Sequence, residues 1–287
     1  MTQADPIGAY GLQLHETSGS RILSDQARSR LLPAEPSWPR WELRHCAPEG
    51  AVPDTEEWGP DRARLQAHPH GCFEFDRIKE RTTFRVPEPI EPEALVHPYL
   101  ASTAAIAGHW LGRSTFHAGA FAVDGRAWGV LGNREMGKSS LLMGLHMQGI
   151  PIITDDIVAL EGQRAFSGPR CLDLRQSAAE QFGAGDPLGR LGRRERWRVR
   201  LPPVPGDWEF AGWILLGWSD TVVTEPLGAQ ERLSALAVNR AVVAAGATPP
   251  GLLDAVALPM VHFARPQDWS QLEPGLRRLL DSLADHA

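Results

Sequence analysis

The residues from Gly132 to Ser139 have the types and spacing needed to bind a nucleotide phosphate. They read GNREMGKS and fit G-x-x-x-x-G-K-[ST], the pattern of a phosphate-binding loop. The two glycines let the backbone turn its N–H groups toward phosphate oxygens, and a following helix adds its positive N-terminal end. The lysine can reach the β- and γ-phosphates, and the serine hydroxyl can ligate Mg²⁺. We therefore expect ATP to be bound by Gly132, Asn133, Arg134, Glu135, Met136, Gly137, Lys138, Ser139 and Ser140.

The sequence on either side of this loop is typical of such a site. Residues 128–131 form a short apolar run, as expected of a buried strand, and residues 139–147 have leucines at helical spacing. Residues 151–154 begin a second apolar strand that runs into Asp155 and Asp156. Mg²⁺ prefers one or two carboxylates together with phosphate oxygens, and this pair can supply them. A chance match to the loop pattern rarely has strands and acids placed in this way.

The spacing of the acids narrows the class of protein. Asp155 lies 17 residues after Lys138, directly beyond the loop helix, whereas many phosphate-loop ATPases and GTPases have their second acidic motif later in the chain. The stretch resembles the kinase domain of the bacterial HPr kinase/phosphorylase family. That family also has a histidine on the strand before the loop strand, and His117 has the corresponding position here. The resemblance covers about residues 95–175. It is closest to the HPr-kinase-like proteins found near peptide-modification genes, including lasso-peptide kinases.

Two departures from the family pattern bear on function. The family loop usually has glycine at the position of Glu135. The signature that HPr-specific enzymes carry after the acid pair is absent, and residues 168–175 read GPRCLDLR instead. We therefore expect nucleotide binding and kinase activity, but neither HPr as a substrate nor a phosphorylase reaction.

The resemblance implies roles for the catalytic residues. Lys138 neutralises the transferring phosphate, and one aspartate ligates Mg²⁺ while the other accepts the proton of an attacking hydroxyl. We assign the metal to Ser139 and Asp156 and the proton to Asp155. His117 is expected beside the triphosphate, where it binds a phosphate or steadies an aspartate. The alternatives are one purely structural aspartate that caps a turn and a purely structural histidine.

Composition indicates a globular chain and excludes several classes of partner. Of the 287 residues 43% are apolar and 22% charged, and the net charge of −6 argues against a nucleic-acid binder. The three cysteines lack metal-ligand spacing, and such a sparse, odd number fits a reducing compartment. The first residues do not resemble a signal peptide, and there is no apolar run long enough to span a membrane. We expect a cytoplasmic protein with no nucleic-acid or membrane partner, and a homo-oligomer remains open.

We expect an α/β fold in two parts. Residues 1–91 alternate in short strand-like runs and predict a small β-rich α+β domain. Residues 92–287 predict an HPr-kinase-like phosphate-loop domain. In this part 92–112 should form one helix and 115–123 one strand, followed by a hairpin turn. Because that hairpin is antiparallel, the sheet should be mixed and largely antiparallel.

The rest of the chain shows compatible patterning and two stretches with alternatives. Residues 183–196 are rich in glycine and arginine, and predict either a mobile flap that brings four arginines to the substrate or a solvated loop; these are Arg190, Arg193, Arg194 and Arg196. The HPHGC stretch at 68–72 predicts a surface loop rather than a metal site. Further strands are expected at 171–174, 197–201, 209–217, 222–226 and 256–263, and helices at 176–181, 229–245 and 270–286.

The leading functional hypothesis is an ATP-dependent kinase. Its acceptor would be a hydroxyl, either of a serine in a peptide or protein or of a small metabolite. The main alternative is a non-catalytic nucleotide-binding accessory protein of a biosynthetic complex, and a nucleotide-driven ATPase is a third. The intact pair Asp155–Asp156 favours the enzyme.

Overall fold

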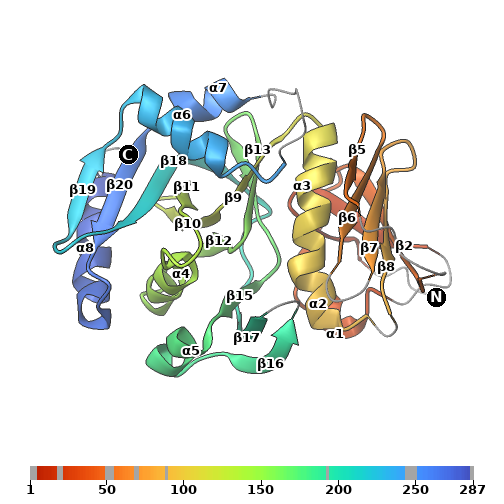
Figure 1. Ribbon diagram of the computed structural model, residues 1–287, viewed down its shortest axis with the longest axis horizontal. Coiled ribbons are helices and arrows are strands. Elements are labelled where there is room, and N and C mark those ends of the chain that lie inside the picture. The colour runs from red at the N-terminus through yellow and green to blue at the C-terminus, as the bar shows by residue number, and fades with distance from the viewer. Residues whose placement is uncertain are drawn as a thin grey trace.

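Two large sheets lie on either side of the helix α3 (Leu100–Trp110), as Figure 1 shows. The structure is a computed structural model that describes residues 5–17, 22–48, 55–67, 71–87, 90–191, 194–242 and 251–284. It has the mixed α/β architecture predicted from the sequence. No helix in these ranges is both long enough and apolar enough to cross a membrane.

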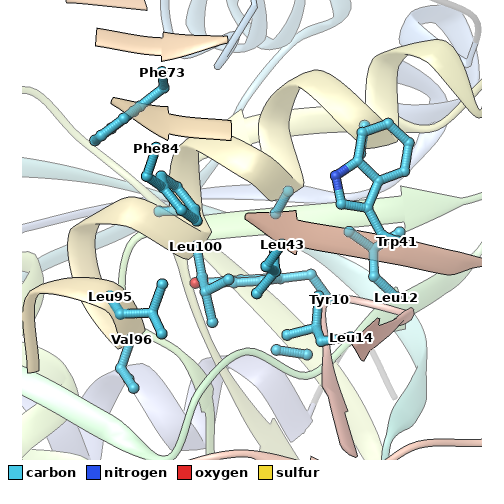
Figure 2. Close-up of a cluster of buried hydrophobic side chains, with 14 of the residues drawn as sticks. Tyr10, Leu12, Leu14, Trp41, Leu43, Phe73, Phe84, Leu95, Val96 and Leu100 are labelled. Carbon is cyan, nitrogen blue, oxygen red and sulfur yellow. The ribbon is translucent and has the colours of Figure 1, made fainter. Parts of the chain in front are cut away.

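The first sheet is built entirely from the N-terminal part of the chain, which confirms its predicted β-rich character. Its eight strands follow the order β3-β1-β2-β4-β8-β7-β6-β5. Alternate residues of β4, Trp41 and Leu43, are buried in a core that also contains Leu100 of α3 and Phe84 of β8 (Figure 2). The strands are β1 (Ile7–Ala9), β2 (Leu12–Glu16), β3 (Leu32–Pro33), β4 (Arg40–Cys46), β5 (Glu57–Trp58), β6 (Arg62–Gln66), β7 (Cys72–Asp76) and β8 (Arg81–Arg85), with the short helix α1 (Asp25–Arg28).

The helix predicted over 92–112 is interrupted. A single turn, α2 (Pro92–Ala94), precedes His97, whose backbone is extended (φ −155°, ψ 125°), and α3 begins only at Leu100. The prediction of one continuous helix was wrong because Pro98 disfavours a helical conformation at the residue before it and has no N–H to donate.

The second sheet is mixed and largely antiparallel, as predicted. Its strands follow the order β12-β10-β11-β18-β14-β13-β9, with β20 and β19 continuing from β18. The pairs β11–β18 and β18–β20 are parallel, so these three strands end at the same edge of the sheet. The strands are β9 (Ser114–His117), β10 (Gly119–Val123), β11 (Arg126–Leu131), β12 (Ile152–Thr154), β13 (Ile157–Glu161), β14 (Arg164–Phe166), β18 (Asp207–Trp218), β19 (Val223–Pro226) and β20 (Met260–Arg265).

The single strand predicted over 115–123 is two strands. β9 pairs with β13, whereas β10 pairs with β11 and β12. The turn at Asp155 and Asp156 separates β12 from β13. Opposite this turn the strand pairing is interrupted between β9 and β10, and the N–H of Ala118 donates to the carbonyl of Asp156 at 3.1 Å. The predicted hairpin turn between β10 and β11 is confirmed, with left-handed Asp124 (φ 50°) and Gly125 (φ 77°).

Helices cover both faces of the second sheet. On one face α4 (Lys138–Met147) and α8 (Leu272–Ala284) enclose a core with Trp128 and Val130 of β11. On the other face α6 (Ala229–Val238) and α7 (Leu252–Ala257) cover the alternate residues of the same strand. The strand predicted over 256–263 begins only at Met260, because Val256 and Ala257 belong to α7. The helix predicted over 229–245 ends at Val238, and residues 243–250 lie outside the described part.

A third sheet contains the glycine- and arginine-rich stretch. It has three strands in the order β15-β17-β16, namely β15 (Cys171–Leu174), β17 (Arg194–Arg200) and β16 (Asp186–Leu191), and α5 (Gln176–Phe182) follows β15. Of the two alternatives for residues 183–196, the solvated loop was wrong for most of the stretch, and the flap stays a prediction. Gly189 (φ 66°) lies at a shift in register between β16 and β17, so this glycine permits a bulge in a strand.

Candidate active site

The predicted phosphate loop connects β11 to α4 at the edge where the parallel strands end. Gly137 (φ 78°) precedes the first helical residue, Lys138, and Gly132 (φ 158°) follows β11. Glu135 (φ 73°) takes the left-handed conformation that favours glycine. Its carboxylate accepts a hydrogen bond from Arg175 at 3.0 Å, so the middle of the loop is tied to the end of β15.

Lys138 folds back across this loop. Its Nζ donates to the carbonyl of Gly132 at 2.5 Å. Partial burial lowers the pKa of the amine, while the charges of Asp156 and Asp155 act in the opposite direction. The N–H groups in the first turn of any helix lack intrahelical acceptors, and those of α4 begin at this loop. Loop, helix end and amine together form a cradle that fits a phosphate group.

Asp155 and Asp156 lie in a tight turn between β12 and β13. The Ser139 hydroxyl donates to Asp155 Oδ1 at 3.0 Å, and the backbone N–H of Asp173 donates to Oδ2 at 3.0 Å. Burial outweighs these two donors and raises the pKa of Asp155 to about 6. The first carboxylate of the pair is therefore fixed directly against the loop serine.

Asp156 faces the predicted histidine. His117 Nδ1 lies 3.2 Å from Asp156 Oδ1, and the two side chains are 46% and 29% exposed. His117 is the last residue of β9 and is paired with Ile157, so the antiparallel register places it beside the acid turn. Such a contact restricts the orientation of the carboxylate.

A cleft of about 930 Å³ contains these groups. All four residues predicted to be catalytic line it: His117, Lys138, Asp155 and Asp156. From the predicted nucleotide loop, Asn133, Arg134, Glu135, Gly137, Ser139 and Ser140 also line the cleft, whereas Gly132 and Met136 do not. The structure thus brings the sequence-predicted residues together around one space.

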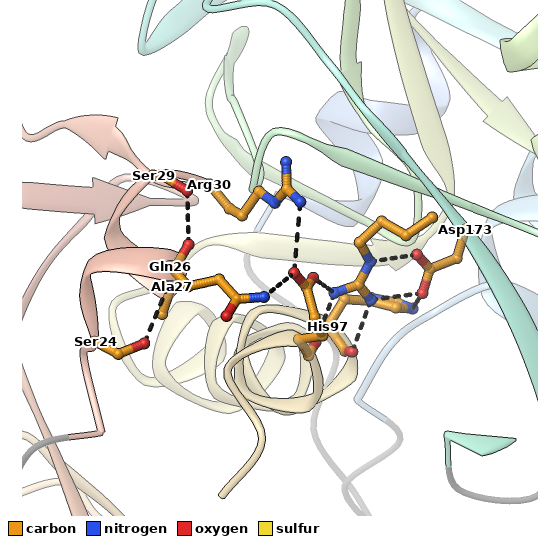
Figure 3. A network of polar contacts seen from close by, with 9 residues as sticks. Ser24, Gln26, Ala27, Ser29, Arg30, His97 and Asp173 are labelled. Atoms are coloured by element: carbon orange, nitrogen blue, oxygen red, sulfur yellow. Dashed lines mark hydrogen bonds and ion pairs between the residues drawn. The ribbon is translucent and has the colours of Figure 1, made fainter. Parts of the chain in front are cut away.

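Several residues of the cleft were not predicted. Asp173 pairs with Arg198 through Nε at 2.6 Å and Nη2 at 2.7 Å, and its Oδ2 lies 3.8 Å from His97 Nε2 (Figure 3). Asp173 could have been suspected from the sequence, because it is an acidic residue within the predicted apolar strand CLDL at 171–174. Nothing in the sequence pointed to His97, since it lay within the helix predicted over 92–112. Trp218 and Arg265 end neighbouring parallel strands, so only the strand order brings them to the cleft.

The four arginines predicted to form a flap are placed differently from one another. Arg194 and Arg196 line the cleft, Arg190 does not, and Arg193 lies outside the described residues. The pKa of Arg194 is lowered chiefly by the positive charge of Arg175, which lines the same cleft. One rim of the cleft is therefore strongly cationic.

The residues of the cleft fit a Mg²⁺ ion that is bound together with ATP. Within the described ranges no three His, Cys, Asp or Glu side chains cluster so as to hold a metal ion. Mg²⁺ bound with ATP takes most of its ligands from phosphates and water, so one hydroxyl and one carboxylate suffice. In the HPHGC stretch Cys72 is buried in β7, and both histidines lie outside the described part of the chain.

Comparisons with known proteins add little to this geometry. No protein-family model and no curated protein matches the chain. Among solved structures, the chain is similar to the HPr(Ser) kinase/phosphatase from Coxiella burnetii, with 14% identity and a TM-score of 0.30 over 60% of this chain and 98% of that chain. At that identity and TM-score the two chains share too little to show a common family or activity.

Proposed function

We propose that this chain is an ATP-dependent kinase that transfers the γ-phosphate to a hydroxyl of a peptide, a protein or a small metabolite. The hydrogen bond between Ser139 and Asp155 carries this proposal, because it joins a phosphate loop to an acid turn within one cleft. A phosphate loop alone fits any nucleotide-binding protein. Two carboxylates beside the loop serine supply the metal ligand and the proton acceptor that transfer to a hydroxyl requires.

The same geometry supports separate roles for the two acids. A pKa of about 6 makes Asp155 a suitable proton acceptor near neutral pH. This leaves Asp156, which lines the same cleft and is 29% exposed, as the Mg²⁺ ligand together with Ser139. Mg²⁺, when bound, shields the charge of the transferring phosphate. Lys138 balances the same charge, and His117 orients Asp156.

The test is transfer of labelled γ-phosphate from ATP to a panel of serine peptides and small hydroxy compounds. We expect the wild type to form a labelled phosphoester, and Asp155→Asn and Asp156→Asn each to lose two or more powers of ten in rate while staying folded. Only Asp156→Asn should also raise the Mg²⁺ concentration needed for half-maximal binding of ATP.

Three other outcomes would change the account. Rates within a few-fold of wild type in both variants would show that the acid turn is structural. A raised Mg²⁺ requirement in Asp155→Asn alone would exchange the two roles. ATP binding without transfer to any compound of the panel would favour the non-catalytic accessory role.

A further inference from the structure

Arg265 lies directly against the phosphate loop. It is the last residue of β20 and is paired with Trp218, the last residue of β18, at the edge where β11 also ends. Its guanidinium carbon is 4.6 Å from the centroid of the Trp218 ring. A Cβ added to Gly137 would be only 2.9 Å from Nη2 of Arg265, so the guanidinium packs on the loop backbone itself.

Arg265 differs in its partners from three other buried arginines, Arg198, Arg170 and Arg113. Arg198 pairs with two carboxylates, Arg170 donates to three main-chain carbonyls and Arg113 donates to two. Arg265 is only 4% exposed, yet its hydrogen bonding within the described residues is a single 3.4 Å contact with the carbonyl of Pro266. Burial, with no opposing carboxylate, lowers its pKa to about 10.

A nearby acid does not supply the missing charge. Asp268 lines the same cleft, but its carboxylate accepts from the backbone N–H of Ser270 and caps a short helical turn. Burying a cation without a counter-ion is costly, so a buried, unpaired guanidinium beside a cleft indicates an anionic ligand. Guanidinium groups bind phosphate through paired hydrogen bonds, and the ring of Trp218 holds the guanidinium plane in one orientation.

We propose that Arg265 binds the phosphate chain of the nucleotide, as a second cation beside Lys138. Arg265 reaches the loop from β20, which pairs with β18 and β19, whereas the acid turn lies between β12 and β13. Arg265, Asp155 and Asp156 all line the same cleft, so a phosphate chain bound there can meet both the cation and the acid pair. This inference rests on the nucleotide binding proposed above.

The test is calorimetric binding of Mg-ATP and of Mg-tripolyphosphate, which has the phosphates without the nucleoside. The variants are Arg265→Met, which keeps apolar volume against Trp218, and Arg265→Gln. We expect both to bind both probes about 10- to 100-fold more weakly than wild type. The control, Arg232→Met, removes a guanidinium that donates to the carbonyl of Leu258 outside the cleft, and it should bind like wild type.

A purely structural role would give a different result. If Arg265 only supports the loop, its neutral variants should melt at a lower temperature than wild type in the absence of ligand. If Arg265 instead binds the ligand, the melting temperature of the unliganded variants should be unchanged or higher. Wild-type affinity for both probes in either folded variant would overturn this inference and leave the proposed function intact. A wild-type protein that binds neither probe would overturn both.

Discussion

At the scale of the residue, Asp155 shows how burial and hydrogen bonding compete at one carboxylate. Two donors, Ser139 Oγ and the N–H of Asp173, favour its charged form, yet burial has the larger effect and raises its pKa to about 6. A carboxyl whose pKa is higher in the folded than in the unfolded chain stabilises the fold at low pH. That contribution is fully present below the unfolded pKa of about 3.8 and is lost as the pH rises through about 6.

The unliganded protein should therefore gain stability above pH 6 when this charge is removed. We predict that Asp155→Asn raises the free energy of unfolding at pH 8 by about 1 to 3 kcal/mol, with a smaller gain at pH 5. Urea unfolding at the two pH values, without nucleotide or Mg²⁺, measures the difference. An equal gain at both values, or a loss at pH 8, would show that the charge of Asp155 is not the cause.

At the scale of the element, the hairpin of β16 and β17 carries the cationic rim of the cleft. Arg194 and Arg196 lie on the part of β17 that lines the cleft, whereas Arg190 on β16 does not line it. The antiparallel register, rather than the glycine content of the stretch, decides which arginines reach the site. Pairing between two strands restricts the positions of such side chains more than a solvated loop would.

This placement predicts unequal effects of the arginines on the acceptor. With the acceptor identified by the transfer assay, Arg194→Ala and Arg196→Ala should raise its Michaelis constant by about 10-fold each if it is anionic, because each loses a charge-assisted contact. Arg190→Ala is the matched control from the same hairpin and should leave the constant unchanged. If all three variants behave like wild type, the acceptor is recognised elsewhere.

The sequence predicted those parts of the site that depend on neighbours in the chain. The loop, its helix and the acid turn follow one another from Gly132 to Asp156, so local patterns suffice to place them. The break between β9 and β10 was not predictable because it is imposed by a partner strand. Arg265 was not predictable either, since its approach to the loop depends on the order of strands in the sheet.

At the scale of the whole molecule, a network of buried ion pairs connects the N-terminal part of the chain to the acid turn. Arg198, whose side chain is 1% exposed, binds Asp173 of the third sheet and Glu93 of the turn before α3. Glu93 also pairs with Arg30 of the N-terminal part at 3.5 Å (Figure 3). The backbone N–H of Asp173 in turn donates to the carboxylate of Asp155. The division into domains at residue 91 stays a prediction, but the N-terminal part is tied to the acid turn through this network.

Breaking the network should destabilise the whole fold. We predict that Arg198→Ala lowers the free energy of unfolding by about 3 to 5 kcal/mol, since it leaves two acids, Asp173 and Glu93, without their buried partner. The control is Arg277→Ala, which removes an exposed ion pair with Glu273 on α8 and should cost less than about 0.5 kcal/mol. Similar, small losses in both variants on urea unfolding would mean that the network does not hold the parts together.

The central claim, that the loop from Gly132 to Ser139 binds Mg-ATP, is tested most directly by thermal unfolding with and without the ligand. A ligand that binds only the folded state at a hundredfold excess over its dissociation constant stabilises it by about 2.7 kcal/mol. We predict that millimolar Mg-ATP raises the melting temperature of the wild type by several degrees, and that Lys138→Ala, folded without nucleotide, loses this response. A wild-type melting temperature that does not respond to millimolar Mg-ATP would contradict the account.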